Sequence, residues 1–347
     1  MPAVAPTRLR AVLLLVALSF LLVAALVGAL VGPISLAPAA VLHELLAWLP
    51  LLDQPSVLSE RERALLWELR VPRVVLAGLV GAMLATAGAA YQGAFRNPLA
   101  DPYLLGIAAG AGLGATLAFA YLPRDGALLV DPLPLAAFVG GLSAVALTYI
   151  LGRSGGRTRA STTLILAGVA VAAFLTAVQT FVLQRHSDTL REVYAWLLGG
   201  LTTVGWREVV LILPYVAASG LLLLLHRRLL DVLSVGEEEV ESLGVRATVV
   251  RLTVIVAATL GTAAAVAVSG LIGFVGIIVP HTVRLVFGAS YRVVLPLSVI
   301  LGAAFLIAAD LLARTALAPA EVPIGVITAF FGGPFFLVVL RKARRVA

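Results

Sequence analysis

A short acidic insert between two apolar stretches is the first feature of this sequence that indicates a binding partner. It lies between Ser234 and Val245 and carries four glutamates, which must reach water at a membrane face because the flanking stretches are apolar and long enough to span a bilayer. Two glycines bracket a short helix in it. The apolar residues Val240, Leu243 and Val245 are unusual for a loop that is only solvated, which is the alternative interpretation. We expect a docking segment made of Gly236, Glu237, Glu238, Glu239, Val240, Glu241, Ser242, Leu243, Gly244 and Val245.

Three arginines at the ends of apolar stretches form a second candidate site. Arg70 and Arg73 stand at the start of one stretch, and Arg314 follows Asp310 by four residues near the end of another. This spacing allows Asp310 and Arg314 to pair, which lowers the cost of placing both charges close to the membrane. Guanidinium groups also bind carboxylates through paired hydrogen bonds. Together the three arginines would therefore suit an acidic surface of a partner protein.

Two segments rich in glycine and proline interrupt the apolar stretches. The segment 91–102 contains Asn-Pro and Asp-Pro pairs, which disfavour a helix and make the turn rigid. It is either a tight connector or a constriction at the inner mouth of a pathway. The segment 270–281 ends in Pro-His. We interpret His281 as a hydrogen-bonding group in a broken helix rather than a metal ligand, because the other three histidines lie on different segments.

Several kinds of chemistry are disfavoured by what the sequence lacks. It has no cysteine, which removes disulfides and thiolate sites. A glycine-rich phosphate loop with a lysine is missing, and the single lysine is Lys342, so the chain is not expected to hydrolyse nucleotide. The motifs Gly-x-Ser-x-Gly and His-Glu-x-x-His are also missing, so an enzyme is poorly supported.

The composition indicates an integral membrane protein built of helices. The 347 residues are 61% hydrophobic and 12% charged, whereas soluble domains are about 45–50% apolar and about 25% charged. The alternation typical of a β-barrel is not visible, so the spans should be helices. The net charge of +7 comes from basic residues scattered at the ends of apolar stretches, which fits membrane orientation better than nucleic-acid binding.

Ten apolar stretches are expected to cross the membrane. The first is too long for the apolar core of a signal peptide, and the seventh and eighth are separated only by Ser269–Gly273. Two shorter segments, 42–49 and 193–198, are expected to lie at the outer face as an amphipathic helix and a half-helix. The predicted spans are 11–31, 71–92, 102–122, 132–151, 161–184, 207–226, 250–270, 271–288, 293–316 and 323–340.

The basic residues predict the orientation of these spans. Lysine and arginine collect in the cytoplasmic segments of membrane proteins. With the N-terminus inside, 16 of the 25 basic residues fall in such segments, so both termini and the acidic insert are predicted to be cytoplasmic. The 16 residues are Arg8, Arg10, Arg96, Arg153, Arg157, Arg159, Arg227, Arg228, Arg246, Arg251, Arg284, Arg292, Arg341, Lys342, Arg344 and Arg345.

A faint internal repeat divides the chain. Landmarks of the first half recur in the second with two residues added, and the repeated spans begin on opposite sides of the membrane, as in the inverted repeats of transporters. These landmarks are Gly81, Gly93, Pro98 and Gly106, with the counterparts Gly261, Gly273, Pro280 and Gly288. We expect one domain over residues 1–347, with the first span at 11–31, repeat one at about 71–184, a linking span at 207–226, a coupling loop at 231–249 and repeat two at about 250–340.

Six motifs in order resemble the permease subunits of type II ABC importers for cobalamin, haem and ferric siderophores, with vitamin B12 members the most similar. The resemblance covers about residues 68–340, and the first 67 residues carry no matching motif. The motifs are Glu68–Arg73, Arg96–Pro102, Leu166–Ala170, Trp196–Gly200, Gly273–His281 and Pro323–Thr328.

This resemblance implies a homodimer in a bacterial plasma (inner) membrane, with two ATPase subunits below it and a substrate-binding protein above it. It implies that Arg70, Arg73 and Arg314 receive glutamates of the binding protein and that Gly236–Val245 enters a groove on the ATPase. It also implies a cytoplasmic gate formed by Asn97, Leu99, Ser161 and Thr162. ATP and Mg²⁺ would be used by the partner ATPase, and this chain would bind no cofactor.

The cargo stays open at this stage. An iron complex such as haem or a ferric siderophore is favoured over cobalamin, but no residue set distinguishes them. The alternative from another class is a secondary transporter driven by an ion gradient, which an inverted repeat permits. An intramembrane enzyme ranks third, because no nucleophile and base form a pair in the sequence.

Overall fold

The computed structural model describes residues 11–47, 56–123, 131–152, 160–201, 205–236, 240, 244 and 246–344. Within these ranges the secondary structure is helical apart from one isolated β-bridge between Leu317 and Ala320. The predicted all-α class is confirmed.

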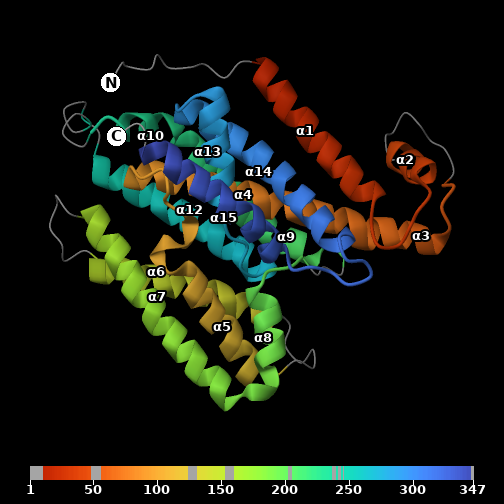
Figure 1. Ribbon diagram of the computed structural model, residues 1–347, viewed down its shortest axis with the longest axis horizontal. Coiled ribbons are helices and arrows are strands. Elements are labelled where there is room, and N and C mark those ends of the chain that lie inside the picture. The colour runs from red at the N-terminus through yellow and green to blue at the C-terminus, as the bar shows by residue number, and fades with distance from the viewer. Residues whose placement is uncertain are drawn as a thin grey trace.

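The helices follow one another along the whole described chain (Figure 1). They are α1 Ala11–Leu30, α2 Pro38–Ala47, α3 Glu60–Ala64, the π-helical η1 Leu65–Arg70, α4 Val71–Phe95, the 3-10 helix η2 Pro102–Leu105, α5 Ile107–Tyr121, α6 Pro132–Gly152, α7 Ala160–Arg185, η5 Ser187–Thr189, α8 Leu190–Leu197, α9 Arg207–Leu225, α10 Arg227–Leu233, α12 Ala247–Ser269, α13 Val275–Phe287, α14 Tyr291–Thr315 and α15 Ile324–Arg344.

Seven helical segments are long and apolar enough to cross a membrane, namely α1, the run Glu60–Phe95, α6, α7, α9, α12 and α14. The shorter apolar helices α5, α13 and α15 occupy the other three predicted spans. The chain is therefore a multi-pass membrane protein with about ten membrane helices, as predicted.

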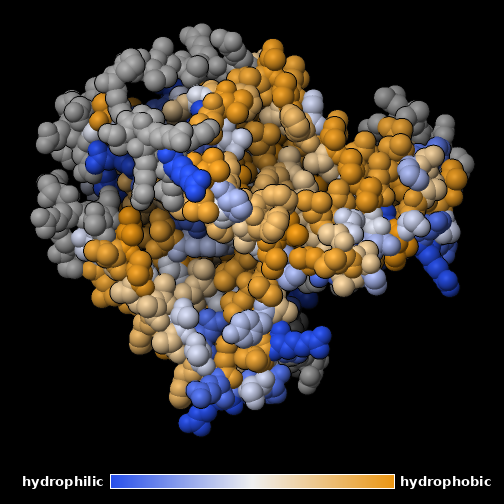
Figure 2. Space-filling view, viewed as in Figure 1, coloured by the Kyte–Doolittle hydropathy of each residue, from blue (hydrophilic) through white to orange (hydrophobic). Residues whose placement is uncertain are grey.

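Hydrophobic residues cover most of the face seen in Figure 2, and hydrophilic ones gather near the turn between α7 and α8 and around α2 and α3.

The second span starts earlier in the structure than the sequence reading placed it. A continuous helical run begins at Glu60, passes through the π-turn η1 and continues as α4. Ser59 and Glu62 start it with a capping box, in which each side chain accepts a hydrogen bond from the other residue's backbone N–H. The π-turn ends at Arg70, three residues before Arg73, and its change of helical phase affects the direction in which these two side chains leave the helix.

The eighth span is shorter than the predicted 271–288. Helix α13 has 13 residues, or about 20 Å at 1.5 Å per residue, against a hydrocarbon core of about 30 Å. Gly270 and Phe274 both have positive φ angles of 65° and 67°, so the chain between α12 and α13 cannot continue as a right-handed helix. The result is a half-helix that begins in the middle of the bundle, where Gly276 meets Gly88 of α4.

Helix α4 forms the centre of the bundle, with α14, α12, α13 and α9 packed around it (Figure 1). Gly81 and Gly88 make this possible, because a Cβ atom at either position would overlap the backbone of Gly302 or Gly276. Of the apolar window in Glu60–Phe95, 78% is buried inside the chain, against 11% for α1. The outer helices therefore depend on contacts beyond this chain to cover their apolar faces.

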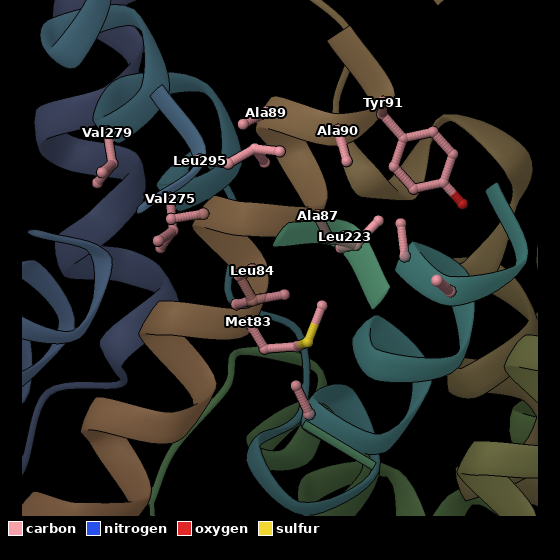
Figure 3. Close-up of a cluster of buried hydrophobic side chains, with 14 of the residues drawn as sticks. Met83, Leu84, Ala87, Ala89, Ala90, Tyr91, Leu223, Val275, Val279 and Leu295 are labelled. Atoms are coloured by element: carbon pink, nitrogen blue, oxygen red, sulfur yellow. The ribbon is translucent and has the colours of Figure 1, made fainter. Parts of the chain in front are cut away.

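Figure 3 shows how α4 is held in place. Met83, Leu84 and Tyr91 of α4 pack with Leu223 of α9 and Leu295 of α14 in one continuous cluster of buried side chains. All five are nearly inaccessible to solvent. A rigid central helix of this kind fixes the positions of both its ends, and the candidate sites lie at those ends.

The helix contacts repeat between the two halves of the chain. Helix α5 packs on α6 as α13 packs on α14, and α4 packs on α14 as α12 packs on α6. An inverted repeat of the kind expected from the sequence would produce such paired contacts, and the repeat stays a prediction.

Candidate functional site

At one end of the bundle, three arginines and two carboxylates form a cluster, here called the arginine cluster: Arg70, Arg73, Asp310, Arg314 and Glu321. Arg73 donates from Nε to Asp310 Oδ1 and from Nη1 and Nη2 to the two oxygens of Glu321, each over 2.9 Å. Arg314 Nε lies 3.3 Å from Asp310 Oδ2. Asp310 is therefore held between two guanidinium groups, and the sequence expectation that it pairs with Arg314 is confirmed.

Two of these arginines also bind the end of α1. Arg70 donates to the carbonyl oxygens of Ala29, Leu30 and Ile34, and Arg314 Nη2 donates to Gly28 O over 2.5 Å. The last carbonyls of a helix lack partners within the helix, and cations at that end are stabilised by the helix dipole. Arg70 and Arg314 thus join α1 to α4 and α14, which explains why both are buried.

The cluster lies beside a cavity of about 150 Å³. Arg73 is the most accessible of its three arginines, and Glu321, which holds it, is 40% exposed. The structure therefore brings the three predicted arginines together, but gives them unequal access to solvent. The cavity is lined by Pro33, Ile34, Leu65, Leu69, Arg70, Arg73 and Arg314.

The predicted gate turn lies at the far end of α4. Arg96 ends the helix in a left-handed conformation, and the Asn97 side chain accepts the backbone N–H of Leu99 over 3.0 Å. Asp101 caps the following η2 helix by accepting the N–H of Tyr103. These bonds brace the turn, as a rigid connection would require. Ser161 and Thr162 fall in the first turn of α7, and their side chains lie outside the part of the chain that the structure describes.

A buried glutamine that the sequence analysis did not single out joins this turn to the broken helix. Gln92 Nε2 donates to Ala100 O over 3.2 Å and to Gly276 O over 2.9 Å, while Arg284 Nη1 donates to Gln92 Oε1. Arg284 in turn donates to the hydroxyl of Tyr291 over 3.4 Å. An amide in the last turn of an otherwise apolar span was the available signal, because a buried amide needs partners of this kind.

The acidic insert begins at the same end of the bundle, after α10. Seven of its ten predicted residues lie outside the described chain: Glu237, Glu238, Glu239, Glu241, Ser242, Leu243 and Val245. Of the other three, Gly236 and Val240 are buried and Gly244 is exposed. The N–H of Val240 donates to Gly236 O over 3.2 Å, and the Val240 side chain is fully buried. This valine thus packs within the chain.

Asp231 attaches the helix before the insert to α14. Its carboxylate accepts the backbone N–H of Tyr291 over 2.6 Å and the hydroxyl of Ser290 over 2.8 Å, and Arg292 Nε lies 3.4 Å away. These groups form the first turn of α14, where a negative charge is stabilised by the helix dipole. A short helix is thus fixed to the start of a long one.

Two of the motifs, Trp196–Gly200 and Pro323–Thr328, meet the segment that leads from α12 into the half-helix. The N–H of Gly200 donates to Ser269 O, and the N–H groups of Ile324 and Gly325 donate to Gly199 O and Leu198 O. A side chain at Gly199 or Gly325 would overlap the carbonyl of Leu271 or Leu198. The glycines of these motifs therefore allow three non-helical segments to approach one another.

No group of three or more His, Asp or Glu side chains suited to a metal ion occurs among the described residues.

The structure is thus a helical membrane bundle with a half-helix in its middle and polar clusters at both ends of its central helix. The chain belongs to the FecCD transport family, whose sequence pattern matches residues 15–342. The family-level resemblance is confirmed.

Known relatives are similar in sequence to most of the chain. The cobalamin import system permease protein of Halobacterium salinarum is 43% identical over 282 residues, which is 81% of this chain and 74% of that protein. The hemin transport system permease protein of Yersinia pestis is 39% identical over 281 residues, 80% of this chain and 83% of that protein. A structure described as a metal-chelate type ABC transporter in an inward-facing conformation matches with a TM-score of 0.82 and 28% identity, covering 96% of this chain and 100% of that one.

Proposed function

We propose that this chain is the permease subunit of an ATP-driven importer that moves a metal chelate inward across a bacterial plasma (inner) membrane. The observation that carries the proposal is the family match over nearly the whole chain. Haem, a ferric siderophore and cobalamin remain the candidate cargoes, because relatives for cobalamin and hemin differ by only a few per cent in identity.

In this proposal the chain pairs with a second copy, and two ATP-binding-cassette subunits bind at the cytoplasmic face and use ATP and Mg²⁺. The chain would bind no cofactor itself. ATP binding would move the acidic insert, and the path between two copies of α7 would open to each side in turn.

The orientation of the helices bears on the topology. Helix α1 ends and helix α15 starts at the arginine end of the bundle. The first residue of α1 and the last residue of α15 therefore lie at the opposite end, which is also the end of α10 (Figure 1). This supports placing both termini and the insert in the cytoplasm.

A continuous set of contacts supports the coupling role of the insert. Asp231, next to the insert, binds the start of α14 at Tyr291, and Tyr291 is bonded to Arg284 of α13. Arg284 binds Gln92, which holds the turn of the proposed gate at Ala100. A displacement of α10 would thus reach the gate turn through packed and hydrogen-bonded groups.

The arginine cluster would receive the acidic surface of a substrate-binding protein at the outer face. Arg73 is the group best suited to exchange partners, because one of its two carboxylates, Glu321, is exposed to water. Arg70 and Arg314 would support the surface from beneath by holding α1 in place.

A secondary transporter would use a membrane carboxylate that binds and releases its ion. Asp310, the deep carboxylate near the end of span nine, is instead held by Arg73 and Arg314. This arrangement favours the ATP-driven importer.

Uptake into membrane vesicles tests the proposal. Vesicles that contain the chain, its ATPase and its binding protein should accumulate haem, ferric siderophore or cobalamin only when ATP is supplied. A Walker-type ATPase variant that cannot hydrolyse ATP serves as the control. Uptake that persists without ATP and without the ATPase subunit would refute the importer and favour the secondary transporter.

The insert has its own test. Reversing Glu237, Glu238 and Glu239 to lysine should weaken association with the ATPase while the chain remains folded and keeps its binding-protein affinity. Co-purification of the ATPase at wild-type yield would contradict this assignment.

A further inference from the structure

A hollow on the outside of the bundle lies between α6, α9 and α12, away from both the arginine cluster and the gate turn. It has a volume of about 120 Å³. Most of its lining is apolar, and its three charged residues lie just before α6 and in the first turn of α9. The lining residues are Asp131, Pro134, Leu135, Phe138, Arg207, Glu208, Leu211, Ile212, Tyr215, Ala264, Ala267 and Val268.

We propose that this hollow binds one phospholipid with a primary-amine headgroup of the phosphatidylethanolamine type. The proposal does not rest on the proposed transport function, since none of the lining residues belongs to the arginine cluster or to the gate turn. Leu135 and Leu211 at its rim are 54% and 43% exposed, and Val210 beside them is 65% exposed. A run of exposed apolar side chains on a membrane helix faces acyl chains or another protein.

The apolar part has the shape of a slot for a chain. Along α9 it extends from Arg207 to Tyr215, eight residue steps or about 12 Å of helix. The small side chains of Ala264 and Ala267 on α12 form its floor, and the rings of Phe138 and Tyr215, 5.4 Å apart, close its deep end. An acyl segment would therefore be in contact with protein on three sides.

The charged end fits a zwitterionic headgroup. Glu208 Oε2 is buried and has no hydrogen-bond partner in the described structure, and the guanidinium of Arg207 has no carboxylate partner there. Asp131 accepts one bond from Leu133 N–H at the start of α6. A phosphate would pair with Arg207, and an ammonium would donate to Glu208. A choline headgroup has no N–H to donate, so it would leave that oxygen unsatisfied.

The position along the membrane also fits a headgroup. Trp206 precedes Arg207, is 41% exposed and donates from its indole nitrogen to Trp67 O over 3.0 Å. Tryptophans are enriched at the level of lipid headgroups. Gly205 N–H donates to Glu68 O, so this level is that of the arginine end.

Native mass spectrometry of the full-length chain tests the site. The detergent-solubilised, delipidated protein is titrated separately with dioleoyl-phosphatidylethanolamine, -phosphatidylcholine and -phosphatidylglycerol. We expect one tightly held phosphatidylethanolamine, retained about tenfold better than the other two, as expected for one hydrogen bond to a charged group. Equal retention of all three lipids, or a preference for phosphatidylglycerol, would overturn the proposal.

Matched variants locate the site. Leu211→Trp fills the slot and should abolish tight retention, whereas Val210→Trp adds the same side chain on the neighbouring exposed position and should not. Glu208→Gln should remove the preference for phosphatidylethanolamine over phosphatidylcholine, and Arg61→Glu, a charge change on exposed α3, should leave it. Retention by Leu211→Trp at the wild-type level, with the protein folded by circular dichroism, would place the lipid elsewhere and refute the assignment.

Discussion

Neutralising Glu321 should strengthen, rather than weaken, the attachment of the substrate-binding protein. In the chain alone, Glu321 occupies Arg73 with two hydrogen bonds of 2.9 Å, in the same geometry that a partner carboxylate would adopt. A glutamate of the binding protein must therefore displace Glu321 before it can bind Arg73. The variant Glu321→Gln removes this competition and leaves the buried pair of Arg73 with Asp310 intact.

The size of the effect follows from the exposure of the pair. Glu321 is 40% exposed and Arg73 15%, so the interaction resembles a surface salt bridge worth about 0.2–1 kcal/mol. Its removal should raise the affinity for the binding protein about 1.5- to 5-fold. Salt screens such exposed charges, so the gain should shrink as the ionic strength rises.

Biolayer interferometry of the binding protein on the permease in nanodiscs measures this change. Glu60→Gln is the control, because it removes an exposed carboxylate from α3 without a contact to Arg73. An affinity for Glu321→Gln at or below the wild-type value would refute the competition. An equal gain for Glu60→Gln would show that only the net charge of this face matters.

Two further predictions concern stability. Gly88→Ala should lower the melting temperature, because the added Cβ would overlap the Gly276 backbone; we expect a cost above about 1–3 kcal/mol, the usual range for overpacking. Gly78→Ala on the same helix is the control: its Cβ would meet only side-chain atoms at 3.6 and 3.8 Å, so it should be neutral or slightly stabilising. Equal melting temperatures for the two variants would contradict the close approach. The hydrogen bond from Ser56 holds the pKa of Glu44 below its usual value, and it outweighs burial, which raises that pKa. Ionised Glu44 therefore stabilises the fold at neutral pH, and this contribution is lost as the pH falls through the lowered pKa. Limited proteolysis near α2 should therefore be faster for Glu44→Gln than for wild type at pH 7, and this difference should shrink as the pH falls below the usual range for a glutamate. A difference that does not change with pH would refute this role.

The sequence predicted the spans well because a membrane helix is selected by local composition. Each apolar stretch needs only its own residues to satisfy its backbone, so the fold class did not depend on contacts between distant segments. The length of α13 was missed because Phe274 adopts a left-handed conformation that its residue type does not suggest. Gln92 was missed for a related reason, since both of its carbonyl partners, at Ala100 and Gly276, are defined only by the packed bundle.

The three arginines show where charge patterns alone stop being informative. The sequence placed them together at one face, but two kinds of partner compete for a guanidinium there: acidic groups of another protein and carbonyls at a helix end. Arg70 and Arg314 bind carbonyls of α1, which lies 40 and 286 residues away in the chain. Replacing either should loosen α1 as well as reduce docking, and only Arg73 should give a loss of binding-protein affinity at unchanged stability of α1. A fall in affinity for Arg73→Ala, set against the rise expected for Glu321→Gln, would therefore identify Arg73 as the docking group, and an unchanged affinity would remove it from that role.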